Sequence, residues 1–261
     1  ETVRQAFKRP AWWVLIFGWF LACCAGAVNS IAFRSFGRYV SHATGATTSI
    51  ALGIHGFADG RHGWAEPDDA IKLLACFLCG AFACGLLVDR NSVHFGGKAL
   101  YGAALVGNSM LLLIAVLVFD AYGDSLAASC LSACACGLQN AMCTSHFGAV
   151  VRTTHVTGTL TDIGSTAGRM AMILLRKGCR RSRLNVLERA EIGVDARKML
   201  VLAPMWLSFL LGSVAGAFLQ NHVRVYALLL PALLTGSLGL TYMLFRQRLK
   251  EQFKKMEQSR L

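Results

Sequence analysis

Residues 98–119 read KALYGAALVGNSMLLLIAVLVF, and this stretch decides the fold. Its only charged residue is Lys98, at the first position. A helix of about 20 apolar residues is long enough to cross the hydrocarbon core of a bilayer. Five more stretches have a similar length and character, at about 12–33, 70–88, 125–145, 199–219 and 225–245. The sequence therefore predicts an all-α, polytopic integral membrane bundle.

The composition agrees with a membrane protein. Of the 261 residues, 55% are apolar and only 15% are charged, whereas soluble domains carry about 25% charged residues. Nine of the ten cysteines lie in apolar segments, where a free cysteine acts as a small hydrophobic residue. Cys76 and Cys79 have the spacing of a metal knuckle, but no second pair follows at a workable distance. We expect no disulfide framework, no metal and no cofactor.

Two further segments, about 43–58 and 157–175, are weaker candidates for membrane helices. Both are rich in Thr, Gly and Ser, and the second contains Asp162 and Arg169. They fit short spanning helices, re-entrant segments or broken helices. If both span, the chain crosses eight times with parallel halves, and if neither spans, it crosses six times with inverted halves. The sequence slightly favours eight.

An internal repeat emerges when the polar positions are aligned. GAVN at 26–29 matches GLQN at 137–140, HATG at 42–45 matches HVTG at 155–158, and FLCG at 77–80 matches FLLG at 209–212. We therefore expect a first membrane repeat at 12–120 and a second at 121–245. The expected remaining segments are a basic N-terminal segment at 1–11, a basic loop at 176–198 that interrupts the second repeat, and a basic tail at 246–261.

The net charge of +12 is concentrated in three segments. Residues 1–10 carry +2, residues 176–198 carry +5 and residues 246–261 carry +4. These runs flank apolar stretches, as the positive-inside rule expects, whereas a nucleic-acid binder carries its basic residues over a folded face. We expect all three segments on one side, the cytoplasmic, matrix or stromal side, of a bacterial or organellar inner membrane. Nucleic acid is not an expected partner.

Two polar motifs carry a family resemblance. GLQNA at 137–141 and RTTHVTGTLTD at 152–162 resemble the central signature of the YoaK-like membrane proteins. YVSHATGAT at 39–47 resembles their first signature, although bacterial members usually have Asn where this chain has Ala46. The resemblance covers most of the chain. It implies a polytopic helical fold and supplies no established activity, and the change at Ala46 removes a polar group from one half.

The same motifs are the candidate functional residues. A Thr-Gly pair that opens a short helix inside a membrane protein leaves backbone N–H groups free, and these favour an anion or a polar solute. The alternative is structural, since the threonines can bond back to helix carbonyls, the glycines can allow close packing and the amides can join helices. The proposed solute path comprises Asn29, His42, Thr44, Gly45, Gln139, Asn140, Arg152, Thr154, His155, Thr157, Gly158, Thr161, Asp162 and Arg169.

Asp162 and Arg169 are the charged members of that set. They are seven residues apart and so share one helix face, and each charge in a membrane costs about 2.5–3.5 kcal/mol on insertion scales. We expect Asp162 to be enclosed in the bundle, with Arg169, His155 or the neighbouring threonines beside it. His42 and His155 either take up protons near pH 6.5 or simply end a helix.

The sequence favours a carrier over an enzyme. No Walker loop, HExxH, GxSxG or paired catalytic carboxylates occur in it. The leading hypothesis is a carrier for a small anionic or polar solute or an ion, with a path between the two repeats. The alternative is a non-catalytic subunit of a large respiratory or photosynthetic membrane complex. The expected partners are membrane lipids, the solute and neighbouring subunits.

Overall fold

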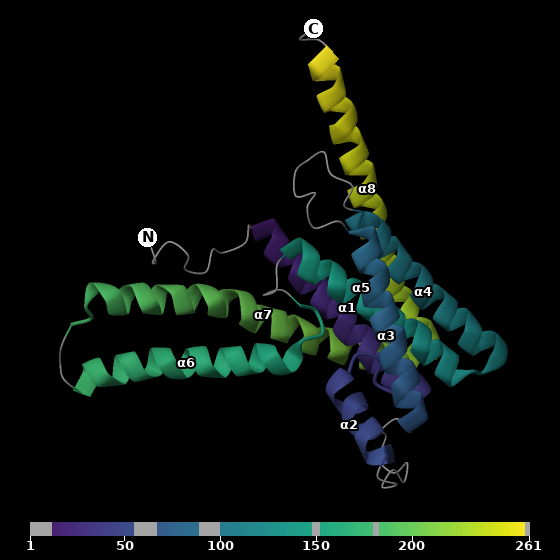
Figure 1. Ribbon diagram of the computed structural model, residues 1–261, viewed down its shortest axis with the longest axis horizontal. Helices are drawn as coiled ribbons and strands as arrows, with labels where there is room; N and C mark the ends of the chain where they lie inside the picture. The colour runs from purple at the N-terminus through teal and green to yellow at the C-terminus, as the bar shows by residue number, and fades with distance from the viewer. Residues whose placement is uncertain (1–11, 55–66, 89–99, 148–151, 180–182, 259–261) are drawn as a thin grey trace.

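The computed structural model describes residues 12–54, 67–88, 100–147, 152–179 and 183–258. These residues form helices without a strand, which confirms the predicted all-α membrane bundle (Figure 1). The helices are α1 (Trp12–Phe36), α2 (Ala43–Ile54), α3 (Pro67–Leu87), α4 (Tyr101–Tyr122), α5 (Ser125–Phe147), α6 (Val156–Cys179), α7 (Val186–Val223), the 3-10 helix η2 (Arg224–Leu228) and α8 (Leu229–Gln258).

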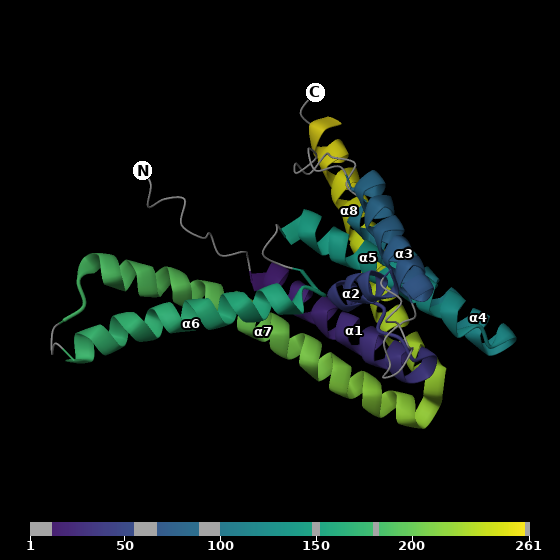
Figure 2. The same ribbon diagram turned by 60° about the horizontal axis from the view of Figure 1, so that its bottom comes forward.

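Five helical runs have the length and composition to cross a bilayer. The apolar runs are α1, α3, α4, the part of α5 at Ser125–Ser145, and a run at Val186–Phe245 that contains α7 and α8. The chain turns back between α7 and α8 at η2 (Figure 2). The α2 helix has only 12 residues, or about 18 Å of helix, against a hydrocarbon core of about 30 Å. The more polar α6 is not among the candidate spans.

Local signals explain where several helices begin and end. Pro67 opens α3 and two aspartates follow in its first turn, which suits the positive end of the helix dipole. Gly123 ends α4 with φ of 66°, a left-handed conformation that glycine adopts readily. Asp124 then caps α5, because its Oδ1 accepts hydrogen bonds from the backbone N–H groups of Leu126 and Ala127.

The α1 and α7 helices cross in close contact and run in the same direction. Trp19 Nε1 donates to the Val201 carbonyl at 3.3 Å near the start, and Arg34 Nε donates to Gln220 Oε1 at 2.7 Å near the end. At the crossing the backbones nearly touch. A Cβ added to Gly26 would lie 2.1 Å from the Phe209 carbonyl oxygen, which explains why small residues occupy this interface.

The α3 and α5 helices also run in parallel, and they meet in the same way. Cys76 lies beside Cys130 and Cys84 lies beside Cys143. A Cβ on Gly137 would lie 2.0 Å from the carbonyl oxygen of Phe77. Gly137 and Phe77 are the aligned counterparts of Gly26 and Phe209, so the same glycine contact occurs in both helix pairs.

The α4 and α8 helices, by contrast, are antiparallel. A Cβ on Gly102 would meet the side chain of Met243, and Thr235 Oγ1 donates to Asn108 Oδ1 at 3.0 Å. Eight crossings would carry α4 and α8 through the membrane in one direction. Six crossings, with α2 and α6 left out, make this pair antiparallel and the α1–α7 and α3–α5 pairs parallel. The directions of the three pairs therefore favour six crossings over the eight that the sequence slightly favours.

Candidate functional site

The turn before α2 is attached to α1 by Asn29. Its Oδ1 accepts hydrogen bonds from the backbone N–H of Ser41, at 3.2 Å, and from the Ser41 hydroxyl, at 3.0 Å. Gly37 ends α1 with φ of 74°, so the chain can turn back at once. The contact fixes the entry of the chain into α2 beside the last third of α1.

Asn140 makes the corresponding contact before α6. Its Oδ1 accepts from the backbone N–H of Thr154 at 3.3 Å and lies 3.5 Å from the hydroxyl of Thr153. Gln139 behaves differently, because its Nε2 donates to the Leu21 carbonyl at 2.8 Å and so joins α5 to α1. The expected helix-joining role therefore holds for Gln139, whereas the two asparagines hold turns.

The α2 helix begins beside the middle of α3 and ends at its start. Its first residues line a hollow together with Leu73, Leu74 and Phe77 of α3, while Gly53 near its end lies against Pro67. The N-terminus of α2 therefore points into the bundle and its C-terminus points out. The turn before α6 likewise lies beside Asn140 of α5, and α6 then runs antiparallel to α7.

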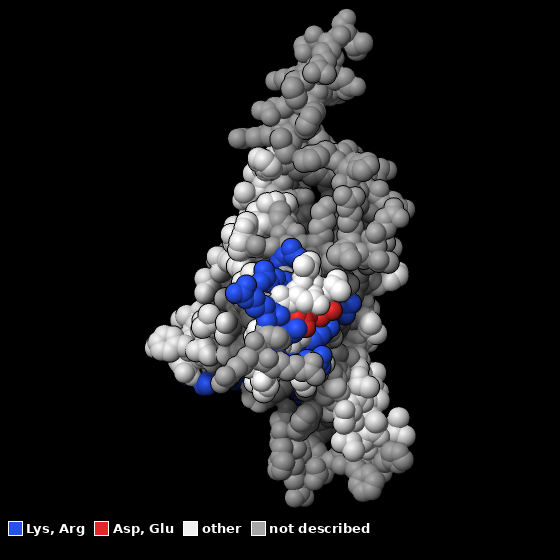
Figure 3. All heavy atoms as spheres, turned by 90° about the vertical axis from the view of Figure 1, so that its left-hand side faces the viewer, with Lys and Arg blue, Asp and Glu red and all other residues white. Residues whose placement is uncertain are grey.

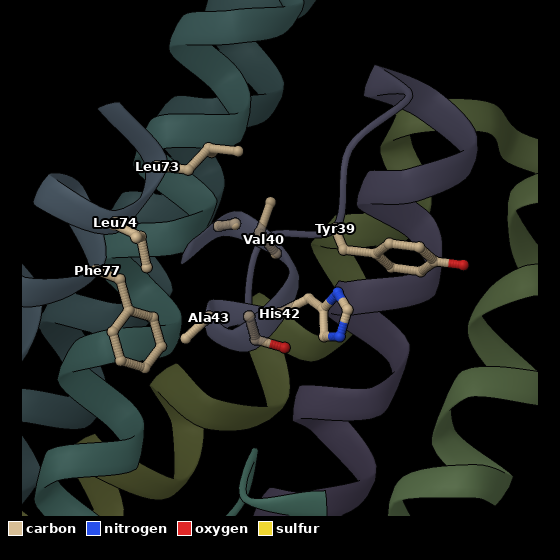
Figure 4. Close-up of a pocket in the computed structure, with 9 residues that line it drawn as sticks. Tyr39, Val40, His42, Ala43, Leu73, Leu74 and Phe77 are labelled. Carbon is tan, nitrogen blue, oxygen red and sulfur yellow. The ribbon is translucent and has the colours of Figure 1, made fainter. Parts of the chain in front are cut away.

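The hollow at the start of α2 is small (Figure 4). Its volume is about 10 Å³, close to the least that admits one water molecule. The exposed ring of His42 lies at its edge, in an edge-on contact with Tyr39 whose centroid separation is 6.0 Å. Ala46 lines the hollow, so the asparagine usual in bacterial YoaK-like sequences would project toward it.

The predicted threonines take part in hydrogen bonds mainly through their backbone groups, and only Thr161 donates its hydroxyl to a helix carbonyl. Thr161 Oγ1 donates to the Thr157 carbonyl at 3.0 Å, and Thr48 Oγ1 donates to the carbonyl of Thr44 at 3.1 Å. Thr44, Thr157 and Thr161 are nonetheless exposed on their helices.

Gly45 is buried, and a Cβ on Gly158 would lie 1.9 Å from Nε2 of His155. The glycine at 158 therefore leaves space for an exposed imidazole. Arg152 lies three residues before His155, and its buried Nε has no hydrogen-bond partner among the described residues. A guanidinium donor and an imidazole thus flank the start of α6.

Asp162 and Arg169 do not pair with each other. Arg169 forms a two-pronged bond to Asp195 of α7, with N–O distances of 2.8 and 2.6 Å, and the bond and charge of Asp195 raise the pKa of Arg169. Asp162 Oδ1 lies 3.1 Å from Lys198 Nζ and its side chain is half exposed. Asp162 therefore has a charged partner, as expected, but the partner is Lys198 of α7, and the predicted enclosure beside Arg169, His155 or the threonines was wrong.

The predicted residues form two separate groups. Among the described helices α2 contacts only α3, and α6 contacts only α7. Sequence reasoning missed Asp195 and Lys198, because both lie in the basic segment that indicates membrane topology. No group of three metal-binding side chains is close enough to hold an ion within the described ranges.

No curated protein and no solved structure matches the chain. The model of the family described as "Protein of unknown function (DUF1275)" matches residues 17–241, a range that includes both polar turns and runs from α1 into α8. The YoaK-like resemblance is compatible with this match. The chain belongs to the DUF1275 family of proteins of unknown function.

Proposed function

We propose that this membrane protein is a non-enzymatic carrier for a small anionic or polar solute, built from two inverted repeats. The observation that carries the proposal is the paired contact of Asn29 with Ser41 and of Asn140 with Thr154. Each contact places the N-terminus of a helix that does not span against a spanning helix. Carriers built from inverted repeats bind solutes at such interrupted helices.

The repeat itself is part of this proposal. Gly212 lies against the Cys23 carbonyl and Gly80 lies against the Cys134 carbonyl, and these are aligned positions of the two halves. In a six-crossing chain α1 and α5 cross in opposite directions, so equivalent helices are inverted. The turn before α2 then faces one side of the membrane and the turn before α6 faces the other.

The chemistry of the turns supports an anion or a polar solute. The first N–H groups of a helix lack partners within the helix, and the dipole makes that end partly positive. Arg152 adds a guanidinium beside the start of α6. We place residues 1–10, 176–198 and 246–261 on the cytoplasmic, matrix or stromal side, because they hold most of the positive charge.

Flux through proteoliposomes tests the carrier proposal. Purified protein should carry at least one of chloride, nitrate, phosphate, small carboxylates or protons. Asn29→Ala and Asn140→Ala should lower that flux at equal protein content. Gly85→Ala is the matched control, because nothing lies within 4 Å of a Cβ there. Folded protein that carries none of these solutes would contradict the proposal.

The second candidate is a non-catalytic subunit of a larger respiratory or photosynthetic membrane complex. The observation in its favour is the last helix, which continues to Gln258 although its apolar run ends at Phe245. This extension projects beyond the other helices (Figure 1) and could dock on a partner. Blue-native gels distinguish the two candidates, because a subunit migrates with a very large complex and a free carrier migrates alone or as a small oligomer.

A further inference from the structure

The α6 helix and the first half of α7 form a hairpin, named here the basic hairpin (residues 156–198). It projects away from the other helices in two views (Figures 1 and 2). Within the described residues α6 packs on no helix other than α7. The outer faces of the basic hairpin are therefore free to meet something outside the bundle.

The contact between the two helices of the hairpin combines ion pairs with apolar side chains. Three ion pairs join them, Asp162 with Lys198, Arg169 with Asp195, and Lys177 with Glu188. Thr159 and Thr166 of α6 are also buried. Ile163, Met170 and Ile173 of α6 are partly buried, so apolar side chains share this contact with the ion pairs.

The outward face of α6 is apolar. Residues at spacings of three, four and seven share one side of a helix. Leu174 is 51% exposed and Leu175 is 66% exposed. The residues of this side, named the α6 stripe, are all exposed and are Leu160, Ala167, Ala171, Leu174 and Leu175.

The α6 stripe is left uncovered by this contact. In water an apolar helix face usually packs against another element, whereas the stripe is exposed, which is stable where the surroundings are apolar on that side. The second half of α7 is an apolar span, so the hairpin emerges directly from the bilayer and its stripe is within reach of lipid.

The charge of the hairpin specifies which lipid surface it suits. The segment 176–198 carries eight basic and three acidic residues. Figure 3 views this end of the molecule and shows Lys and Arg gathered on it, with little acidic surface. Arg176, Arg183, Arg189 and Arg197 are exposed and form no ion pair within the described part of the chain. Such side chains attract the phosphates of anionic lipids.

We propose that the basic hairpin is an interfacial element that binds anionic phospholipid. The α6 stripe enters the boundary between headgroups and acyl chains, as amphipathic helices do, and the exposed arginines contact lipid phosphates. This role does not depend on transport, so the hairpin binds anionic lipid in either candidate function.

Site-specific quenching tests the proposal on the full chain in vesicles. A fluorescent amino acid replaces Ala171 in the stripe or, as the matched control, Ser165 on another exposed side of the same helix. The vesicles contain phosphatidylcholine alone or mixed with phosphatidylglycerol, with brominated acyl chains as the lipid quencher and acrylamide as the aqueous quencher. We expect brominated lipid to quench position 171, more strongly with phosphatidylglycerol, and acrylamide to quench position 165.

Charge variants provide the second measurement. Replacing Arg176, Arg183 and Arg189 together with Gln should lower the quenching in phosphatidylglycerol to the level in phosphatidylcholine. High salt should have the same effect on the unmodified hairpin, because it screens exposed charges. Circular dichroism checks that each variant keeps its helix content.

Three results would overturn the proposal. Quenching of position 171 by acrylamide would show a stripe open to water. Protection of position 171 from both quenchers would show that protein, from a second copy or another subunit, covers it. Equal quenching of positions 165 and 171 by brominated lipid would show a hairpin immersed in the membrane, without an interfacial orientation.

Discussion

Two asparagine side chains determine how the chain enters the short helices. Asn29 and Asn140 each use a single carbonyl oxygen as an acceptor for the following turn. None of these hydrogen bonds lies within a helix. The position of each turn therefore depends on one asparagine side chain. Their matched geometry explains why the sequence repeat shows best at polar positions.

Removing the acceptor should loosen each turn. Asn140→Ala removes the bonds to Thr153 and Thr154, and Asn29→Ala removes both bonds to Ser41. Since each bond contributes about 0.5–1.5 kcal/mol, we expect each change to destabilise the fold by about 1–3 kcal/mol. Hydrogen exchange of the Thr154 or Ser41 amide should accelerate in the matching variant.

The aspartate variants Asn140→Asp and Asn29→Asp are the controls, because they keep an acceptor oxygen at that position. They should slow exchange relative to the alanine variants. Equal exchange in the alanine and the unmodified proteins would show that the asparagines do not hold the turns.

At the level of elements, glycine contacts fix the two parallel pairs. The hypothetical Cβ on Gly80 lies 2.0 Å from the Cys134 carbonyl oxygen, and its other near neighbours are also backbone atoms. Backbone atoms cannot move aside as a flexible side chain can. The pairs α1–α7 and α3–α5 therefore behave as rigid units.

A single methyl group should separate α3 from α5. Gly80→Ala forces the backbones apart, and we expect a loss of about 1–3 kcal/mol, the typical cost of overpacking. Gly85→Ala in the same helix meets nothing within 4 Å and should leave stability equal or slightly higher, because alanine favours helix. Thermal unfolding in nanodiscs measures both, and equal melting temperatures would refute the close contact.

The stability of the first turn of α7 should depend on pH. Asn185 and Glu188 form a capping box, and the Asn185 N–H, followed by the Lys177 ammonium, lowers the pKa of Glu188. A lowered folded pKa stabilises the helix start above the unfolded pKa of about 4.3, and this stabilisation disappears as the pH falls through the folded pKa.

Glu188→Gln removes this titration and is the matched reference at each pH. Amide exchange in the first turn of α7, corrected for its intrinsic pH dependence, should rise below about pH 4 in the unmodified protein and stay flatter in Glu188→Gln. The same pH dependence in both proteins would show that Glu188 is not the group responsible.

At the scale of the whole molecule, sequence predicts what periodicity and composition determine. The apolar runs predict α1, α3, α4 and α5 within a few residues, whereas α7 begins well before its predicted run, at Val186, and α8 continues well beyond its run, to Gln258. The aligned tetrapeptides identify the glycines and asparagines that make matching contacts. Partners across helices are not predictable in this way. The Asp162–Lys198 and Arg169–Asp195 pairs depend on how α6 lies along α7, which the spacing of Asp162 and Arg169 on their own helix does not specify.

The number of crossings also depends on tertiary contacts. The segment at 43–58 is apolar enough to be considered a span, but the structure gives α2 only 12 residues. The opposed directions of α4 and α8 are the stronger argument, because contacts such as Thr235 with Asn108 join residues far apart in the sequence. No local pattern contains that information.

Labelling at the end of α4 distinguishes six crossings from eight. Tyr122 is 82% exposed and lies at the end of α4, whereas Cys179 is exposed at the end of α6. With six crossings these two positions lie on opposite sides of the membrane, and with eight they lie on the same side. A membrane-impermeant maleimide should therefore label Cys179 and Tyr122→Cys from opposite sides of sealed vesicles.

Cys179→Ser removes the reference label, and Ser259→Cys should label from the Cys179 side, since both lie in basic segments. If Tyr122→Cys labels from the Cys179 side, six crossings and the inverted repeats are both wrong, and α2 and α6 must each cross the membrane.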